Sequence, residues 1–316
     1  MWSSKRWLPT KIEKIMDNPA AVDAAIDAHF ADVLTAIAPL DLDAVDLVNE
    51  PRVNHEVMDL LGKDVMAKWW TRADALNPGP QYYLNDYGIL NGGGSNSNAV
   101  AIYKQWLETI AQGGGKVEGI GFQGHFGNAL TPPEQLWKIL DEFAGYGVPL
   151  QVTEFDVDTT DEQAQADYTR DFYTAMFAHE AVDGVFMWGF WEQIHWRPNG
   201  AMFRKDWSPK PNLKAYRDLV LGEWWTDETT QTNETGAATV RGFLGEYRIV
   251  VETENAIAVQ SVTLVQNGST VTVRLASSER AAGSCSRFML EVGHIACRLP
   301  ACPGLLNMWC RTAVAG

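Results

Sequence analysis

Two glutamates are the residues of this sequence that could carry out chemistry as a pair. Glu50 ends the stretch D-L-V-N-E, and Glu154 lies in the largely apolar stretch L-Q-V-T-E-F-D-V. Hydrolysis of a glycosidic bond with retention needs one carboxylic acid, which protonates the leaving oxygen, and one carboxylate about 5 Å away, which attacks the anomeric carbon. An ionised glutamate in an apolar strand is costly unless it is used or paired. The two residues could supply these carboxyl groups, although Glu50 alone could also be an ordinary surface residue.

Side chains that suit a sugar lie near both glutamates or follow other apolar runs. Asn49 is next to Glu50, where its amide could orient that carboxyl group and bind a sugar 2-hydroxyl. Asp156 is two residues after Glu154, on the same side if the strand continues. The remaining candidates are hydrogen-bonding groups and a wall of flat aromatic rings: Asn85, Tyr87, Gln123, His125, Trp188, Trp191 and Trp196. One of the three tryptophans could instead serve core packing.

The candidates recur at a spacing that fits a repeating strand–helix unit. Short apolar runs end roughly 35 residues apart, the length that a strand, a helix and two loops require, at Glu50, Asn85, Gln123, Glu154 and Trp188. We therefore predict an α/β fold of the TIM (β/α)8 barrel type, in which the carboxyl ends of the strands carry the chemistry. A doubly wound sheet would also alternate, but no phosphate-binding glycine loop follows a strand here.

The same patterns divide the chain into four parts. Residues 1–225, whose first helix is predicted from Pro19 to Ile37, hold about five to six of eight units, so we expect a barrel that lacks its first strands. The polar residues 226–238 are predicted to be a linker. Alternating apolar residues and the turn signal Asn267-Gly268 predict a small β module over residues 239–278. Residues 279–316, which contain all four cysteines, fit neither pattern and are expected to form an irregular tail.

Charge and composition limit the kinds of partner, metal and cofactor that this protein is expected to bind. The net charge of −15 disfavours nucleic acid and anionic membranes, so we expect a neutral substrate. No apolar run is long enough to span a membrane, and the first residues lack the apolar stretch of a secretory signal. The spacings of His294, Cys297, Cys302 and Cys310 match no strong zinc pattern, so we predict no metal site and no cofactor.

Taken in order, these motifs resemble those of glycoside hydrolase family 10, the xylanases, from about Trp2 to Trp225. The resemblance rests on D-L-V-N-E, Y-L-N-D-Y, G-I-G-F-Q-G-H-F, V-T-E-F-D-V and W-G-F-W-E-Q-I-H-W-R-P-N-G-A-M-F-R-K-D-W-S-P-K-P. It implies that Glu50 is the general acid/base, Glu154 the nucleophile and Asn49 a sugar-binding amide. It also implies substrate contacts from Trp188 and Trp196, with Trp191 beside them.

The sequence departs from the family pattern in two places. The opening strands of the family, with a sugar-binding Lys and Asn, have no counterpart before Met1, and Ser3 stands where many members carry a sugar-binding His. The resemblance implies endo-1,4-β-xylanase activity on xylan or xylo-oligosaccharides. It also implies a secreted or periplasmic location, since polymeric xylan lies outside cells, and we expect a monomer. Another retaining β-1,4-glycanase, acting on glucan or mannan, and a non-catalytic xylan-binding remnant remain open.

Overall fold

We describe the protein from a computed structural model, which defines residues 1, 8–254, 256–265, 269–275, 290–292 and 305–311. The contacts within the chain divide it into two units, Met1–Lys214 and Ala215–Gly316.

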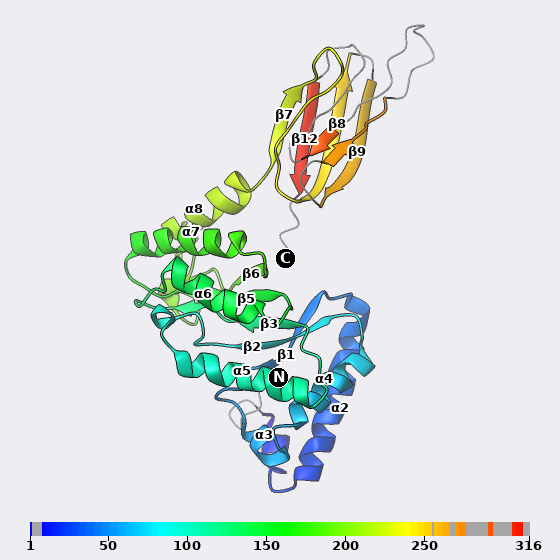
Figure 1. The fold of residues 1–316 in the computed structure, drawn as a ribbon. Coiled ribbons are helices and arrows are strands. Elements are labelled where there is room, and N and C mark those ends of the chain that lie inside the picture. The colour runs from blue at the N-terminus through cyan, green and yellow to red at the C-terminus, as the bar shows by residue number, and fades with distance from the viewer. Residues whose placement is uncertain (2–7, 255, 266–268, 276–289, 293–304, 312–316) are drawn as a thin grey trace. The chain divides into compact units, whose positions relative to one another are not determined.

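The first unit is built on a parallel sheet (Figure 1). Its strands run in the order β1, β2, β3, β5, β6, and the short β4 pairs with β5 beyond the end of β3. The bounds are β1 Ala44–Asn49, β2 Gln81–Asp86, β3 Gly119–Phe122, β4 His125–Phe126, β5 Leu150–Val157 and β6 Val182–Met187. Among the described residues, β1 pairs with no named strand except β2 and β6 with none except β5, so the sheet is open at both edges. The predicted ends at Glu50, Asn85, Gln123 and Trp188 fall within one residue of the observed ends of β1, β2, β3 and β6, whereas β5 continues for three residues past Glu154.

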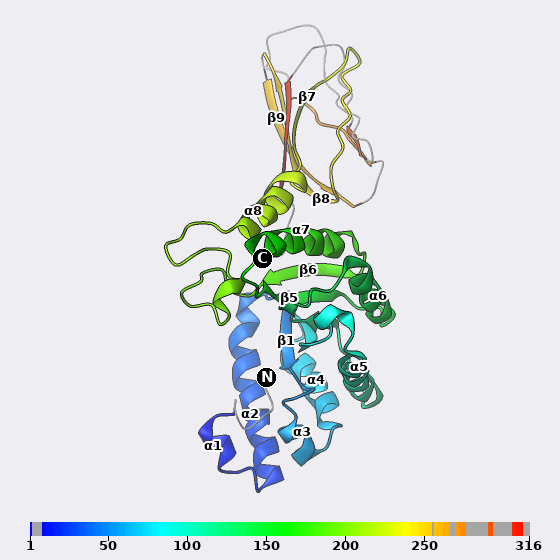
Figure 2. The same ribbon diagram turned by 90° about the vertical axis from the view of Figure 1, so that its left-hand side faces the viewer.

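Helices alternate with these strands and cover one side of the sheet (Figure 2). Their bounds are α1 Thr10–Glu13, α2 Pro19–Ile37, α3 Glu56–Leu61, α4 Val65–Leu76, α5 Ser97–Gln112, α6 Pro133–Ala144, α7 Glu162–Ala178 and α8 Pro211–Asp218. Short helical turns occupy Ala38–Leu40, Gly92–Gly94, Pro198–Gly200 and Leu219–Glu223. The prediction for α2 is confirmed: Asn18 caps it by accepting from the Ala21 N–H, and Pro19 occupies the first turn.

Aromatic side chains fill the space between the sheet and α7. The rings of Phe155 on β5 and Phe172 on α7 stack at 4.5 Å and 17°, and both contact Phe126 of β4. All three are at most 2% exposed. This packing fixes the ends of β4 and β5, and these strands carry His125 and Glu154.

The second unit holds a four-stranded antiparallel sheet in the order β7, β12, β8, β9, and a separate pair, β10 with β11. The bounds are β7 Asp227–Gln231, β8 Gly245–Thr253, β9 Ala256–Leu264, β10 Ser269–Val271, β11 Leu290–Val292 and β12 Leu305–Arg311. As the alternation predicted, Tyr247, Ile249 and Val251 of β8 point into a common core and are at most 3% exposed.

The structure differs from two expectations about this unit. The stretch expected to be a linker contains β7, and the tail expected to be irregular contains β11 and β12. A Thr-rich polar strand can pair at a sheet edge through its backbone, so composition alone hid β7. Several residues discussed above lie outside the described part of the chain: Trp2, Ser3, Asn267, Gly268, Cys285, His294, Cys297 and Cys302.

Candidate active site

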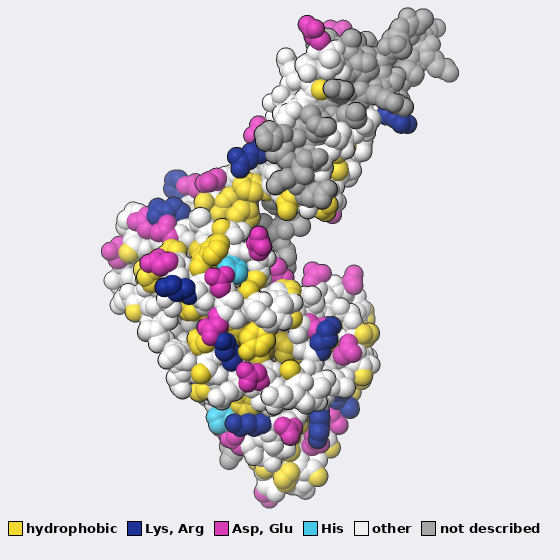
Figure 3. Space-filling view, viewed as in Figure 1, with side chains coloured by type: hydrophobic (Ala, Val, Ile, Leu, Met, Phe, Trp, Pro, Cys, Tyr) yellow, Lys and Arg dark blue, Asp and Glu magenta, His cyan; other side chains and the backbone are white. Residues whose placement is uncertain are grey.

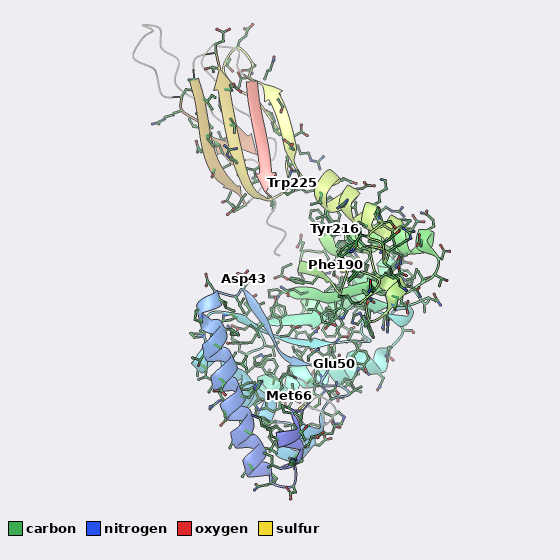
Figure 4. The ribbon with its side chains drawn as sticks, turned by 180° about the vertical axis from the view of Figure 1, so that it is seen from behind. Asp43, Glu50, Met66, Phe190, Tyr216 and Trp225 are labelled. Carbon is green, nitrogen blue, oxygen red and sulfur yellow. The ribbon has the colours of Figure 1, made fainter. Side chains whose placement is uncertain are left out.

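Glu50 directly follows one strand of the parallel sheet, and Glu154 lies toward the carboxyl end of another. Glu50 comes directly after β1, as Figure 4 shows, and has a left-handed backbone with φ of 58°. Its N–H donates to the Asn85 carbonyl at 2.8 Å, so the sheet ladder continues past the strand and holds this unusual conformation. Glu154 lies within β5, and its N–H donates to the Gln123 carbonyl at 2.7 Å.

Two amides hold the carboxylate of Glu50. Gln123 Nε2 donates to Oε1 at 2.8 Å, and Asn54 Nδ2 donates to Oε2 at 2.8 Å. Gln123 was a predicted site residue, whereas Asn54 was missed. Its only signal in the sequence is its position four residues after Glu50.

Glu154 is more buried than Glu50, with 8% of its surface exposed. Asn85 Nδ2 donates to Oε1 at 3.2 Å, and His125 Nε2 lies 3.1 Å from Oε2. Asn85 Nδ2 also donates to Asn49 Oδ1 at 3.1 Å, and Gln123 Nε2 reaches the same oxygen at 3.3 Å. Three amide side chains therefore join the two glutamates in one hydrogen-bonded chain.

His125 lies between two carboxyl groups. Its Nδ1 is 3.0 Å from Asp156 Oδ2 and its Nε2 is 3.1 Å from Glu154 Oε2. Burial by itself would lower the pKa of His125, but the hydrogen bonds to Asp156 and Glu154 outweigh burial and raise the pKa above its ordinary value of 6.5. A protonated imidazole there can donate to both carboxyl groups at once.

Asn85 is oriented by neighbours that the sequence analysis did not single out. The Thr153 hydroxyl donates to Asn85 Oδ1 at 2.8 Å, which leaves the Nδ2 donors for Asn49 and Glu154. Gly121 on β3 faces the same side chain, and a Cβ there would lie 2.6 Å from Asn85 Oδ1. The glycines of the G-I-G-F stretch were the available signal, because a glycine inside a strand often marks a close approach.

The loop after Glu50 is anchored to the end of β2. The Arg52 N–H donates to Asp86 Oδ2 at 3.0 Å, and its guanidinium lies 4.5 Å from the centre of the Tyr87 ring. Burial, aided by the nearby Glu50, raises the pKa of Asp86 to about 7, against the hydrogen bonds from Arg52 and Tyr87 that lower it. Tyr87, a predicted site residue, is therefore partly engaged by Arg52.

Two of the three predicted tryptophans lie beside His125. The rings of Trp188 and Trp196 are centred 6.3 and 4.7 Å from the His125 ring, and Trp196 Nε1 donates to Asp156 Oδ2 at 2.8 Å. Trp191 lies elsewhere in the same segment, stacked on Trp207 at 4.8 Å and 14°. The aromatic wall beside His125 thus has two members, and Trp207 was not predicted.

Within the described residues, no three His, Cys, Asp or Glu side chains are placed to hold a metal ion. In the same part of the chain, none of the helices combines the length and apolar character that crossing a membrane requires. The candidate site itself consists of two carboxyl groups set among amides, an imidazole and two indole rings.

Comparisons with known proteins identify the family of the chain. Residues 1–219 match the family model for glycosyl hydrolase family 10. The chain is 29% identical over 251 residues to the anti-sigma-I factor RsgI6 of Acetivibrio thermocellus, covering 79% of this chain and 32% of that protein. It is 29% identical over 211 residues to endo-1,4-beta-xylanase 1 of Arabidopsis thaliana, covering 67% of this chain and 22% of that protein. The chain thus spans a third or less of these two relatives.

Solved structures share the fold. Xylanase 10B from Thermotoga petrophila RKU-1, in complex with xylobiose, superimposes with a TM-score of 0.55 at 22% identity, over 62% of this chain and 65% of that one. The endo-1,4-beta-xylanase XylE of Penicillium canescens gives 0.59 at 18% identity, over 69% and 71%. The predicted (β/α)8 barrel class is confirmed, with an open sheet in the described residues. Because the family model matches most of its length, the chain belongs to glycosyl hydrolase family 10.

Proposed function

We propose that this protein is an endo-1,4-β-xylanase that cleaves xylan with retention of configuration. The observation that carries the proposal is the hydrogen-bonded chain of Asn49, Asn85 and Gln123 that joins Glu50 to Glu154. Retaining glycosidases need two carboxyl groups held close together, and these three amides hold both carboxyl groups at one edge of the sheet. Similarity to proteins named as endo-1,4-beta-xylanases supports xylan as the polysaccharide.

We assign the roles from the surroundings of each glutamate. Glu154 is buried, and its two oxygens lie against the amide donor of Asn85 and the imidazole of His125, so its carboxyl group is held in one place, as a nucleophile requires. Glu50 is less buried, and its carboxyl group accepts hydrogen bonds from Gln123 and Asn54, which orient that group just beyond the end of β1. Glu50 is then the general acid/base.

The proposed reaction has two displacements. Glu50 gives its proton to the glycosidic oxygen while a Glu154 oxygen bonds to the anomeric carbon, so the leaving sugar departs and a glycosyl-enzyme ester forms. Glu50, now ionised, takes a proton from water as the water oxygen attacks that carbon and displaces Glu154. Both glutamates return to their starting states.

The surrounding residues divide into those that face the sugar and those that position the glutamates. Asn49 is half-buried and its Nδ2 donates to none of the described residues, so we propose that it binds a substrate hydroxyl. Asn85 is fully buried with its polar atoms used by other side chains, which supports a positioning role. Trp188 and Trp196, 44% and 53% exposed, offer ring faces to a sugar.

The surface is consistent with a neutral substrate. Acidic and basic side chains are interspersed on the face of residues 1–214 seen in Figure 3. A polyanion would require a block of cations, and the net charge is −15. For such a polymer we also propose a secreted or periplasmic protein.

One experiment tests the activity and the roles. We expect wild-type protein to release reducing sugar from xylan at least tenfold faster than from carboxymethylcellulose or mannan, and Glu154→Ala to lose roughly 10³-fold or more. Glu50→Gln should reduce xylan cleavage far more than cleavage of an aryl xylobioside with an activated leaving group, because only poor leaving groups need protonation.

Each alternative has its own outcome in this experiment. Faster cleavage of carboxymethylcellulose or mannan would identify a different retaining β-glycanase. A wild-type protein that binds xylan without cleaving the aryl xylobioside would be a non-catalytic binding protein, a reading that the open edges of the sheet favour. Equal losses for both substrates in Glu50→Gln would contradict the acid/base role.

A further inference from the structure

An aromatic stack lies in the segment between β6 and α8, apart from the rings that face His125. The indoles of Trp191 and Trp207 are parallel at 14° with centres 4.8 Å apart, and the rings of Phe190 and Phe203 lie 6.1 and 5.8 Å from Trp207. Trp191 Nε1 donates to the Lys205 carbonyl at 3.1 Å, and this hydrogen bond fixes the indole of Trp191 within the stack. Phe190 belongs to this segment and is labelled in Figure 4.

The other ring of the stack, Trp207, is exposed to solvent. Trp191 covers one face of Trp207, and Phe190 and Phe203 are tilted against the ring, yet 52% of Trp207 remains exposed. Phe190, at the edge of the ring, is 53% exposed. Trp207 and Phe190 therefore leave neighbouring aromatic surface in water, and it is such a group of exposed apolar side chains, more than a single one, that marks a binding surface.

The backbone under Trp207 is strained in order to present this ring. Its φ is 66°, a left-handed conformation that disfavours bulky side chains and favours glycine. A tight turn holds it: the Trp207 N–H donates to the Arg204 carbonyl at 2.9 Å, and the Arg204 N–H donates to the Ser208 carbonyl at 2.9 Å. Asp206 Oδ1 locks the turn by accepting from the Ser208 N–H and hydroxyl at 3.0 and 2.6 Å. A strained backbone conformation is therefore maintained at an exposed aromatic residue, which points to a role in binding.

The chemistry around the ring selects a neutral sugar chain. A flat apolar ring, with the exposed residues Lys205 and Asp206 directly before it in the chain, matches a pyranose, which is apolar on its faces and carries hydroxyls at its rim. The neighbouring charges are of opposite sign, so they attract neither a polyanion nor a polycation. The same β6–α8 segment carries Trp188 and Trp196, which face the candidate active site, so one polysaccharide could contact both groups of rings.

We propose that Trp207, supported by Trp191 and Phe190, is a platform that binds the polymeric substrate outside the bond-cleaving site. The identity of the polymer as xylan rests on the proposed function. The platform would raise affinity for long chains and contribute little to short substrates, which fill only the space around Glu50 and Glu154. It is a second point of attachment for the same polymer.

The test separates binding from cleavage. In a Glu154→Ala background, electrophoresis through gels containing soluble xylan measures affinity without hydrolysis. We expect Trp207→Ala to weaken binding roughly 3- to 10-fold, Trp207→Phe to weaken it less, and Trp137→Ala to leave it unchanged. Trp137 is a matched control, because it is 38% exposed on α6, away from the β6–α8 segment. In active protein, Trp207→Ala should raise the KM for polymeric xylan and change aryl xylobioside kinetics by less than about twofold.

The outcomes are distinguishable. Unchanged xylan binding in Trp207→Ala, or an equal loss in Trp137→Ala, would overturn the platform. An equal loss on polymer and aryl xylobioside would overturn it too, because the ring would then act on the cleavage site. If wild-type protein cleaves nothing but its xylan binding depends on Trp207, the platform stands and the proposed function fails.

Discussion

At the scale of single residues, the site depends on which atoms are left free after the amides have bonded to one another. Asn85 has two N–H donors, and the hydroxyl of Thr153 occupies its oxygen, so both donors go to Asn49 and Glu154. His125 contributes a second donor to Glu154 and keeps its proton to higher pH than an ordinary histidine, because two carboxyl groups raise its pKa. The protonated ring therefore contributes stability in full below pH 6.5, and that contribution is lost as the pH rises through the raised pKa.

The position of Asn85 can be tested through the glycine that faces it. Gly121→Ala places a Cβ 2.6 Å from Asn85 Oδ1, so the amide must move and its bond to Glu154 weakens. We expect kcat on an aryl xylobioside to fall roughly 10²-fold, the size associated with a displacement of about 1 Å in a catalytic group. Gly127→Ala is the matched control, since a Cβ there meets no atom within 4 Å. Wild-type kcat in Gly121→Ala would show that Asn85 does not position the nucleophile.

At the scale of elements, the strands bring the chemistry to one edge and the helices hold the strands in place. α7 illustrates this: Phe172 on its inner face stacks on Phe155 of β5, the residue directly after Glu154. Asp161 caps the start of the helix, and its Oδ1 accepts from the N–H groups of Gln163 and Ala164 at 3.1 and 3.0 Å. These bonds satisfy two of the four N–H groups that a helix start leaves open.

Removing this cap should destabilise the first unit. Asp161→Ala is expected to lower the free energy of unfolding by about 1 kcal/mol, measured by urea denaturation. Asp167→Ala, in the same helix, removes an exposed pair with Arg170 and should change it by less than about 0.5 kcal/mol. Similar losses in the two variants would mean that charge, and not capping, stabilises the start of α7.

At the scale of the whole molecule, the two units have separate cores. The second unit packs Tyr247, Ile249 and Val251 of β8 against its own residues, including Leu264 and Val273. The candidate site uses residues of the first unit alone. We therefore expect the stability of one unit to be separable from the chemistry of the other.

A substitution in the second core tests this independence. Ile249→Ala removes a fully buried side chain and should destabilise the second unit by about 2–5 kcal/mol, seen by calorimetry as a shift in one of two transitions. Ile257→Ala is the control, because Ile257 of β9 is 65% exposed. Turnover of an aryl xylobioside below both transitions should be unchanged in either variant. A single transition that shifts as a whole would contradict independent units.

The sequence by itself determined the elements and their order. The strand ends near Glu50, Asn85 and Gln123 and the helix Pro19–Ile37 follow from apolar runs, helical spacing and a cap, all of which depend on neighbours within a few residues. Ordered motifs then identified the family, and the match over residues 1–219 confirmed it. The alternation of apolar and polar residues along β8 is likewise a pattern of near neighbours in the sequence.

Only the tertiary structure decided which of these residues touch. The placement of His125 between Glu154 and Asp156 and the stacking of Trp191 on Trp207 depend on strand register and loop packing. The polar β7 became a strand through pairing with β12, far along the chain. Such contacts join residues that are distant in sequence, so they are set by the packing of the whole fold and leave little trace in local composition.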